Sequence, residues 1–190
     1  MKEAATIPLV GLTAWTCLIS FAEIKKDDRV LIQAGAGGVG SFSIQLAKNK
    51  GSRVAVTSSG DNVDLLKELG ADQVINYENE NFEDVLGSID VVLDTLGGEN
   101  QNRSFNVLKK GVVLTLTTTK PDEKLVKEYD VKAYQVSMKR DADILNQISD
   151  LIEKVKIRPV VKTIFDLSEV KEAHKISESG HARGKIVLRI

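Results

Sequence analysis

The sequence predicts an α/β protein in which a doubly wound, six-stranded parallel sheet is covered by helices on both faces. Strand-like and helix-like segments alternate along most of the 190 residues, which is the order that a parallel sheet with crossover helices requires. The strand-like segments are continuous runs of valine, isoleucine and leucine, and such runs indicate strands that are buried on both faces. A glycine-rich turn, residues 35–40, joins the first strand-like run to a helix-like run.

The first strand is expected at residues 29–34, a short β-rich run that leads into the glycine turn. Residues 39–50 then carry apolar side chains at helical spacing, and Gly51 ends the helix because glycine is a common helix stop. The second strand follows at residues 53–57. These segments predict a strand, a crossover helix and a parallel strand in close succession.

A short helix is expected next, at residues 61–69. Asp61 is placed to cap its first turn, and Gly70 follows its last residue as a stop. Residues 74–75 form a minimal strand, and residues 82–86 form a helical turn. This part of the chain therefore predicts the third strand with short helical connections on either side.

The second half of the sheet follows the same alternation. Strands are expected at residues 89–94, 112–118 and 131–136, with a helix at residues 100–108 between the first two. The last strand completes a six-stranded sheet, and residues 143–155 after it form a strongly amphipathic helix.

Residues 1–25 predict a helix that precedes the first strand. Its apolar part, residues 7–22, contains threonine, serine and proline and falls short of the roughly 20 apolar residues that a membrane span needs. No convincing small-residue cleavage site follows it. We therefore expect a buried helix rather than a signal peptide or a membrane anchor.

The end of the chain does not fit the six-stranded pattern. Residues 158–165 and 184–190 are strand-like and flank a helix at residues 168–177. We therefore divide the chain into a sheet domain with its leading helix, residues 1–157, and a strand–helix–strand segment, residues 158–190.

Composition and charge exclude several classes of function. The chain is 42% hydrophobic and 28% charged with a net charge of −1, so it lacks the basic surface of proteins that bind nucleic acid or anionic membranes. Cys17 is the only cysteine, which rules out an internal disulfide and fits a cytoplasmic protein. His174 and His181 lack metal-ligand spacing, so we expect no metal site.

The glycine turn has the pattern of a dinucleotide-binding site. Gly35 allows a tight turn, Gly37 lets the backbone approach a pyrophosphate, and Gly40 lets the helix pack closely on the strand. The alternative is a turn that binds nothing, which is disfavoured because four glycines in six residues lose backbone entropy without an evident packing gain. The expected cradle consists of Gly35, Ala36, Gly37, Gly38, Val39 and Gly40.

The end of the second strand bears on the choice between NAD(H) and NADP(H). NAD sites usually place an acidic residue about 20 residues after the turn to bind the ribose 2′-hydroxyl. Ser58 and Ser59 stand there instead, and their hydroxyls can bind a 2′-phosphate without charge repulsion. We therefore favour NADP(H). NAD(H) stays open because the loop has no Arg or Lys and because Asp61, if it is not a helix cap, can turn toward the ribose.

Several stretches resemble the medium-chain dehydrogenases/reductases, and the resemblance runs in order along essentially the whole chain. The last of them, residues 173–174 and 181–188, are similar to the zinc-independent quinone reductase branch, whose members transfer a hydride between NADPH and a quinone or another activated carbonyl or alkene. The remaining matching stretches are residues 3–15, 34–40, 69–72, 75–77 and 94–98.

The resemblance implies a Rossmann cofactor domain that needs no metal and in which no catalytic acid or base is identified. Asp61 departs from the family pattern, which often has Arg or Lys in that loop. The implied cofactor contacts are Thr13 near the nicotinamide, Gly37 to Val39 at the pyrophosphate, Ser59, Asn62 and Tyr77 around the 2′-phosphate, Leu96, Gly97, Thr117 and Thr118 along the crevice, and Lys185 at a cofactor phosphate.

The resemblance also implies that the chain is a fragment. Family members begin with a GroES-like catalytic domain that supplies most of the substrate pocket, and their final segment joins that domain. We therefore expect this chain to bind NADPH but to turn over substrate poorly or not at all. Family dimers pair through an edge strand of the sheet, here residues 131–136. The alternatives are a nucleotide sensor without catalysis and, less favoured because Ser59 replaces an acidic residue, a class I methyltransferase.

Overall fold

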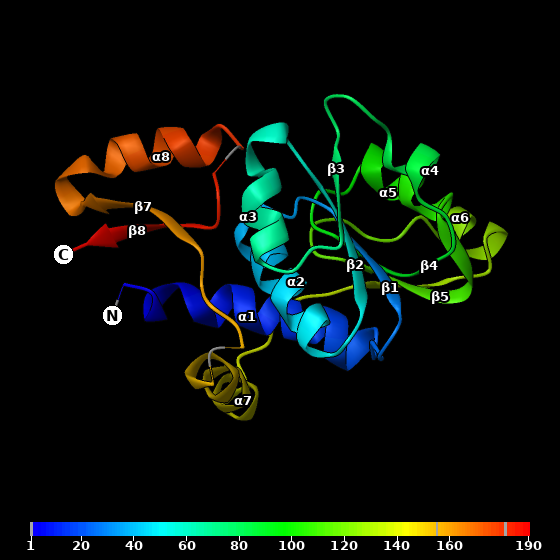
Figure 1. Ribbon diagram of the computed structural model, residues 1–190, viewed down its shortest axis with the longest axis horizontal. Coiled ribbons are helices and arrows are strands. Elements are labelled where there is room, and N and C mark those ends of the chain that lie inside the picture. Colours follow the sequence, from blue (N-terminus) through cyan, green and yellow to red (C-terminus); the bar gives the residue numbers. More distant parts are fainter. Residues whose placement is uncertain (1, 155, 181) are drawn as a thin grey trace.

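The computed structural model, which describes residues 2–154, 156–180 and 182–190, has the doubly wound fold that the sequence predicts (Figure 1). Six parallel strands form one sheet in the order β3-β2-β1-β4-β5-β6. The strand order reverses between β1 and β4, and ligands of open α/β sheets bind at the carboxyl ends of the strands at such a point. The strands are β1 (Arg29–Ile32), β2 (Arg53–Ser58), β3 (Gln73–Asn76), β4 (Ile89–Asp94), β5 (Leu108–Leu116) and β6 (Lys132–Gln135).

Helices cover both faces of the sheet and lie on opposite sides of it in Figure 1. Side chains of β1 show how both faces are buried: Val30 and Ile32 pack with α2 and α3, whereas Leu31 packs on the other face with Phe82 of α4 and Phe105 of α5. This two-sided burial is the reason for the continuous apolar runs. The α-helices are α1 (Ile7–Trp15), α2 (Gly38–Asn49), α3 (Val63–Glu68), α4 (Phe82–Val85), α5 (Glu99–Phe105), α6 (Glu123–Glu128), α7 (Ala142–Glu153) and α8 (Val170–Glu178).

The leading helix is buried against the rest of the molecule. By length and composition the segment Ala4–Phe21 could cross a membrane, since its mean hydropathy is 1.6. In the structure it packs against α2 and α7, with Phe42 and Ile148 in the same apolar cluster as Trp15. This packing is that of a core helix. The helix changes to π geometry over Thr16–Phe21 and ends there, so the expectation of one helix over residues 1–25 was too long.

Two local expectations were wrong, and one helix was missed. Asp61 does not cap a helix: Gly60–Asn62 forms a 3₁₀ turn, and no side chain caps that turn or α3. The strand expected at residues 112–118 begins earlier, at Leu108, because a β-bulge lets Leu108 pair with Ile89. Helix α6 was not expected, although Asp122 caps it by accepting hydrogen bonds from two backbone N–H groups.

The C-terminal segment forms the separate strand–helix–strand unit that the sequence predicts. Strands β7 (Val161–Asp166) and β8 (Lys185–Arg189) pair in parallel, and α8 connects them. Figure 1 shows this unit beside α1 and α3, away from the six-stranded sheet. Gly184 joins it to the glycine turn, because its N–H donates to the carbonyl of Ala36 at 2.7 Å. Treating residues 1–157 and 158–190 as two domains is a division that we propose.

Candidate nucleotide-binding site

The glycine turn lies between β1 and α2, as its sequence context predicts. A Cβ on Gly40 would lie 2.4 Å from the Ala34 carbonyl oxygen, and one on Gly35 would lie 2.9 Å from Cβ of Val56. Glycine is therefore required at both positions by close packing of the turn on itself and on β2. A Cβ on Gly37 would meet only the Ala34 oxygen at 3.4 Å. The side of Gly37 on which a side chain would stand is therefore open to a ligand, while its backbone forms a β-bridge with Gly184.

Helix α2 directs its amino end at this open face. Gly37 is the residue before the first helical turn, with φ −70° and ψ 173°. The first N–H groups of a helix have no acceptor within the helix, and together with the helix dipole they attract an anion. The twelve-residue length of α2 and the open backbone at Gly37 give the turn the geometry of a pyrophosphate cradle.

Two adjoining cavities extend from the glycine turn along the carboxyl ends of the strands. The smaller has a volume of about 100 Å³ and the larger about 380 Å³, and Ala34, Tyr77 and Gly180 line both. Together they lie where the strand order predicts a nucleotide. The smaller cavity collects many of the predicted residues, since its lining is Ala34, Ala36, Gly37, Ser58, Ser59, Asn62, Tyr77, Gly180 and Ala182.

Asn62 carries an unpaired buried acceptor at the smaller cavity. Its Nδ2 donates to Oγ of Ser59 at 2.8 Å, while its Oδ1 has no hydrogen-bond partner although the residue is only 8% exposed. Buried polar atoms are nearly always paired in folded proteins, and an unpaired one points to a missing ligand or water. A ribose hydroxyl has the donor that this oxygen lacks, so the residues present fit the adenosine half of a dinucleotide.

Tyr77 and Leu96 expose large side chains into the larger cavity. Their exposed fractions are 54% and 49%, and both residues line that cavity. A flat adenine ring that covers such side chains removes apolar surface from water. This arrangement brings together two predicted contacts that come from different strand ends.

The turn after β4 is fixed by a buried carboxyl group. Oδ1 of Asp94 accepts the N–H groups of Leu96 at 2.7 Å and Gly97 at 3.0 Å, while Oδ2 has no partner. Burial raises the pKa of Asp94, and the two hydrogen bonds offset part of that rise. The turn packs against the end of β5, because a Cβ on Gly97 would lie 2.8 Å from the Thr118 hydroxyl oxygen. Leu96, Gly97 and Thr118 therefore lie together as predicted.

Replacing Asp94 with asparagine should change how stability depends on pH. The folded-state pKa of Asp94 is raised from 3.8, so above that pH the folded protein binds more protons than the unfolded chain, and its stability falls as the pH rises. Asparagine keeps an acceptor oxygen and does not titrate. We expect the Tm of Asp94→Asn minus that of the wild type to increase between pH 4 and pH 7 in thermal unfolding followed by circular dichroism. A constant or decreasing difference contradicts the raised pKa.

A buried polar network beneath the glycine turn was missed by sequence reasoning. Oγ1 of Thr57 donates to Oε1 of Gln33 at 2.6 Å and accepts the N–H of Ala34 at 3.2 Å, while Nε2 of Gln33 donates to Ser104 at 3.4 Å. These bonds tie the turn to β2 and α5. The available signal was a glutamine, buried here at 1% exposure, directly after an apolar strand.

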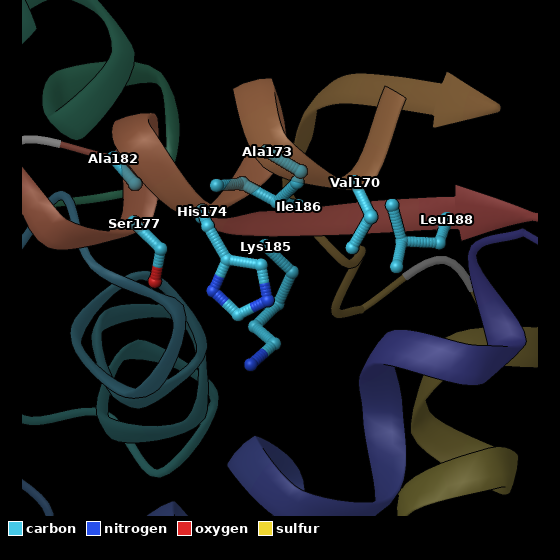
Figure 2. A pocket seen from close by; sticks show the side chains of 9 residues that line it. Val170, Ala173, His174, Ser177, Ala182, Lys185, Ile186 and Leu188 are labelled. Carbon is cyan, nitrogen blue, oxygen red and sulfur yellow. The ribbon is translucent and has the colours of Figure 1, made fainter. Parts of the chain in front are cut away.

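Of two further predicted contacts, Lys185 lies against the glycine turn, whereas Thr13 lines neither of the two adjoining cavities. The Lys185 stem crosses Gly38, since a Cβ there would lie 2.8 Å from its Cδ, and Figure 2 shows its ammonium group pointing to the same side as the His174 ring, in a cavity of about 280 Å³. The sequence did not predict that His174 lies in this cavity beside Lys185. The Thr13 hydroxyl donates to the Leu9 carbonyl at 2.7 Å, and Thr13 lines neither of the two adjoining cavities described above.

The structure shows no metal-binding cluster in the part of the chain that it describes, and its cysteine is buried. No group of three or more His, Cys, Asp or Glu side chains is placed to hold an ion there; His181 lies outside the described residues. Burial raises the pKa of the Cys17 thiol to about 12, which keeps it protonated and unreactive.

Comparisons with known proteins place the chain in a family of enzymes. A family model described as zinc-binding dehydrogenase matches residues 69–188. The chain is 32% identical over 219 residues to the mitochondrial NAD(P)H oxidoreductase RTN4IP1 of Danio rerio, covering 99% of this chain and 57% of that protein. It is 38% identical over 194 residues to the 2-methylene-furan-3-one reductase of Solanum lycopersicum, covering 98% of this chain and 46% of that protein.

Solved structures of similar fold are also oxidoreductases. The quinone oxidoreductase from Coxiella burnetii matches with a TM-score of 0.93 and 38% identity, covering 98% of this chain and 60% of that one. The Escherichia coli quinone oxidoreductase complexed with NADPH matches with a TM-score of 0.90 and 26% identity, covering 99% of this chain and 65% of that one. The chain spans about half the length of the curated relatives that it matches. It belongs to the zinc-binding dehydrogenase family, within the medium-chain dehydrogenases/reductases.

Proposed function

We propose that the chain is the NADP(H)-binding part of an NAD(P)H-dependent oxidoreductase that reduces a quinone or another activated carbonyl or alkene. The observation that carries this proposal is the pair of adjoining cavities, which run from the open backbone of Gly37 to Ser59, Asn62 and Tyr77. The relatives named as an NAD(P)H oxidoreductase, an enone reductase and quinone oxidoreductases support the reaction class.

The chain's own residues bind and orient the dinucleotide. The nicotinamide, when bound, supplies the hydride, so the protein contributes position and electrostatics. Backbone N–H groups at the start of α2 hold the pyrophosphate, Ser59 and Asn62 hold the adenosine ribose, and the turn after Asp94 forms the opposite wall of the crevice. We assign no catalytic acid or base to these residues. Substrate recognition belongs to the portion of the longer relatives that this chain does not match.

Several finer features are part of the same proposal. Ser58 and Ser59 favour NADP(H) over NAD(H), because hydroxyl groups bind a phosphate without repelling it. We propose that the enzyme is cytoplasmic, needs no metal, and interacts with neither membranes nor nucleic acid. We also propose a homodimer through β6, one of the two edge strands of the sheet, since an unpaired strand edge is a template for pairing with a second copy.

Thermal unfolding with three nucleotides tests the proposed function. A ligand that binds only the folded state stabilises it by mass action and so raises Tm. At a ligand concentration a hundredfold above Kd, the free energy of unfolding increases by about 2.7 kcal/mol. We expect NADPH to raise Tm most, NADH less, and S-adenosylmethionine not at all. A shift with S-adenosylmethionine alone would indicate a methyltransferase, and no shift with either reduced nucleotide contradicts the proposed cofactor site.

Activity separates an oxidoreductase from a nucleotide sensor. The chain contains no residue that we assign to substrate, so NADPH oxidation at 340 nm with a quinone should be slow for the 190-residue chain. A longer protein that also contains the portion of the relatives that this chain does not match should be active. Binding of NADPH without turnover by that longer protein favours a sensor.

A further inference from the structure

Two charged side chains from distant parts of the chain are bonded to neighbouring residues of the loop after β2. Oε2 of Glu78 accepts the backbone N–H of Gly60 at 3.0 Å. Nη2 of Arg183 donates to the backbone carbonyl of Asp61 at 2.5 Å. Glu78 follows β3 and Arg183 precedes β8, so the fold brings a carboxylate and a guanidinium to the same loop.

This loop forms a wall of the smaller cavity, and both charged residues adjoin that cavity. Tyr77, next to Glu78, and Ala182, next to Arg183, line it together with Ser59 and Asn62. The unpaired and buried Oδ1 of Asn62 lies in the same loop. The two charges therefore stand at the place where the proposed cofactor carries either a 2′-hydroxyl or a 2′-phosphate.

The two groups recognise different forms of the cofactor. A carboxylate accepts a hydrogen bond from a ribose 2′-hydroxyl and repels a 2′-phosphate, whereas a guanidinium binds phosphate through two parallel N–H groups. Within residues 58–62 the only charged residue is Asp61, and it is exposed. Arg183 is thus the cation that the loop's own sequence lacks, and it comes from 122 residues away.

We propose that Glu78 and Arg183 together set the choice of cofactor and let the site accept both forms. Arg183 favours NADP(H) by pairing with the 2′-phosphate. Glu78 favours NAD(H), because it holds the Gly60 N–H that a 2′-phosphate would otherwise take and offers an acceptor to a 2′-hydroxyl. This inference rests on the proposed function, since it requires that a dinucleotide binds in this cavity.

The ratio of two dissociation constants tests the inference without any need for turnover. NADPH and NADH fluorescence titrations on the full chain give one Kd each, and their ratio is insensitive to a general loss of folded protein. We expect Arg183→Met to reduce the preference for NADPH about tenfold, as the loss of one hydrogen bond to a charged group does. Glu78→Gln should increase that preference about threefold, because the carboxylate is exposed to solvent.

Matched controls distinguish a local effect from a change in overall charge. Arg140→Met and Glu128→Gln remove the same charges at exposed positions outside the cavity linings and should leave the ratio unchanged. Arg183→Lys keeps the charge but loses the planar fork, so its ratio should lie between those of the wild type and Arg183→Met. It also replaces Arg183→Met in the test if that variant does not fold.

The outcomes separate this inference from the proposed function. If the wild type binds both nucleotides but neither the Arg183 nor the Glu78 variant shifts the ratio, or if both shift it in the same direction, the charge-pair inference is wrong and the cofactor site stands. If the wild type binds neither nucleotide, the proposed function fails as well. Opposite shifts at the two positions, with unchanged controls, support the inference.

Discussion

Replacing Gly40 with alanine lowers the free energy of unfolding by roughly 3 kcal/mol, the upper end of the cost of overpacking a well-packed site. The added Cβ would lie 2.4 Å from the Ala34 carbonyl oxygen and 2.8 Å from Cα of Gly35. Both neighbours are backbone atoms, which no side-chain rotation can move away. The turn must therefore open, and the change is measured as a fall in Tm of roughly 6–12 °C for a domain of this size.

A glycine in open space provides the control for that variant. Nothing lies within 4 Å of a Cβ placed on Gly87, so Gly87→Ala should change stability by less than about 0.5 kcal/mol. If Gly40→Ala unfolds at the same temperature as Gly87→Ala, that result contradicts the close contact between α2 and the glycine turn.

Replacing Gly37 with alanine should weaken cofactor binding strongly and leave the fold intact. The new Cβ meets only the Ala34 oxygen, at an ordinary contact distance of 3.4 Å, and φ of −70° suits alanine as well as glycine. The methyl group nevertheless covers the backbone that a pyrophosphate must approach. We expect NADPH affinity to fall about 100-fold, the loss of one strong hydrogen bond to a charged phosphate.

The contrast between the two glycine variants separates stability from binding. Gly37→Ala should melt within a few degrees of the wild type, and its Kd for NADPH, measured by isothermal titration calorimetry, should rise. An unchanged Kd would mean that the dinucleotide does not approach the backbone at Gly37. A large fall in Tm would mean that the open face described here is instead a packed one.

Most of the fold follows from local sequence patterns. Residues such as Val30 and Leu31 pack against helices on opposite faces of the sheet. Because both faces are buried, successive strand residues are apolar, and these runs are recognisable in the sequence. Boundaries were less predictable where tertiary contacts override local preference. The pairing of Leu108 with Ile89 through a bulge extends β5 back to the last residue of the helix expected at residues 100–108. The role of Asp61 as a helix cap was wrong because the chain enters α3 through a 3₁₀ turn.

The candidate site was less predictable because its charges come from distant segments. Glycines and serines that follow a predicted strand can be recognised as candidate binding residues from their position in the sequence, as Gly37 and Ser59 were. Glu78 and Arg183 have no such signal, since one follows a minimal strand and the other lies in the C-terminal unit. Only the packing of that unit beside α3, where Arg183 reaches the carbonyl of Asp61, shows that the loop has a cation.

We propose that a reduced nicotinamide dinucleotide binds along the carboxyl ends of the strands, between the glycine turn and the loop after β2. Hydrogen–deuterium exchange of the chain with and without NADPH locates the binding site on the backbone. We expect slower exchange at residues 35–40 and 58–62, with little change in β7 and β8. Binding of NADPH with protection confined to the C-terminal unit, or with no protection at the glycine turn, would contradict it.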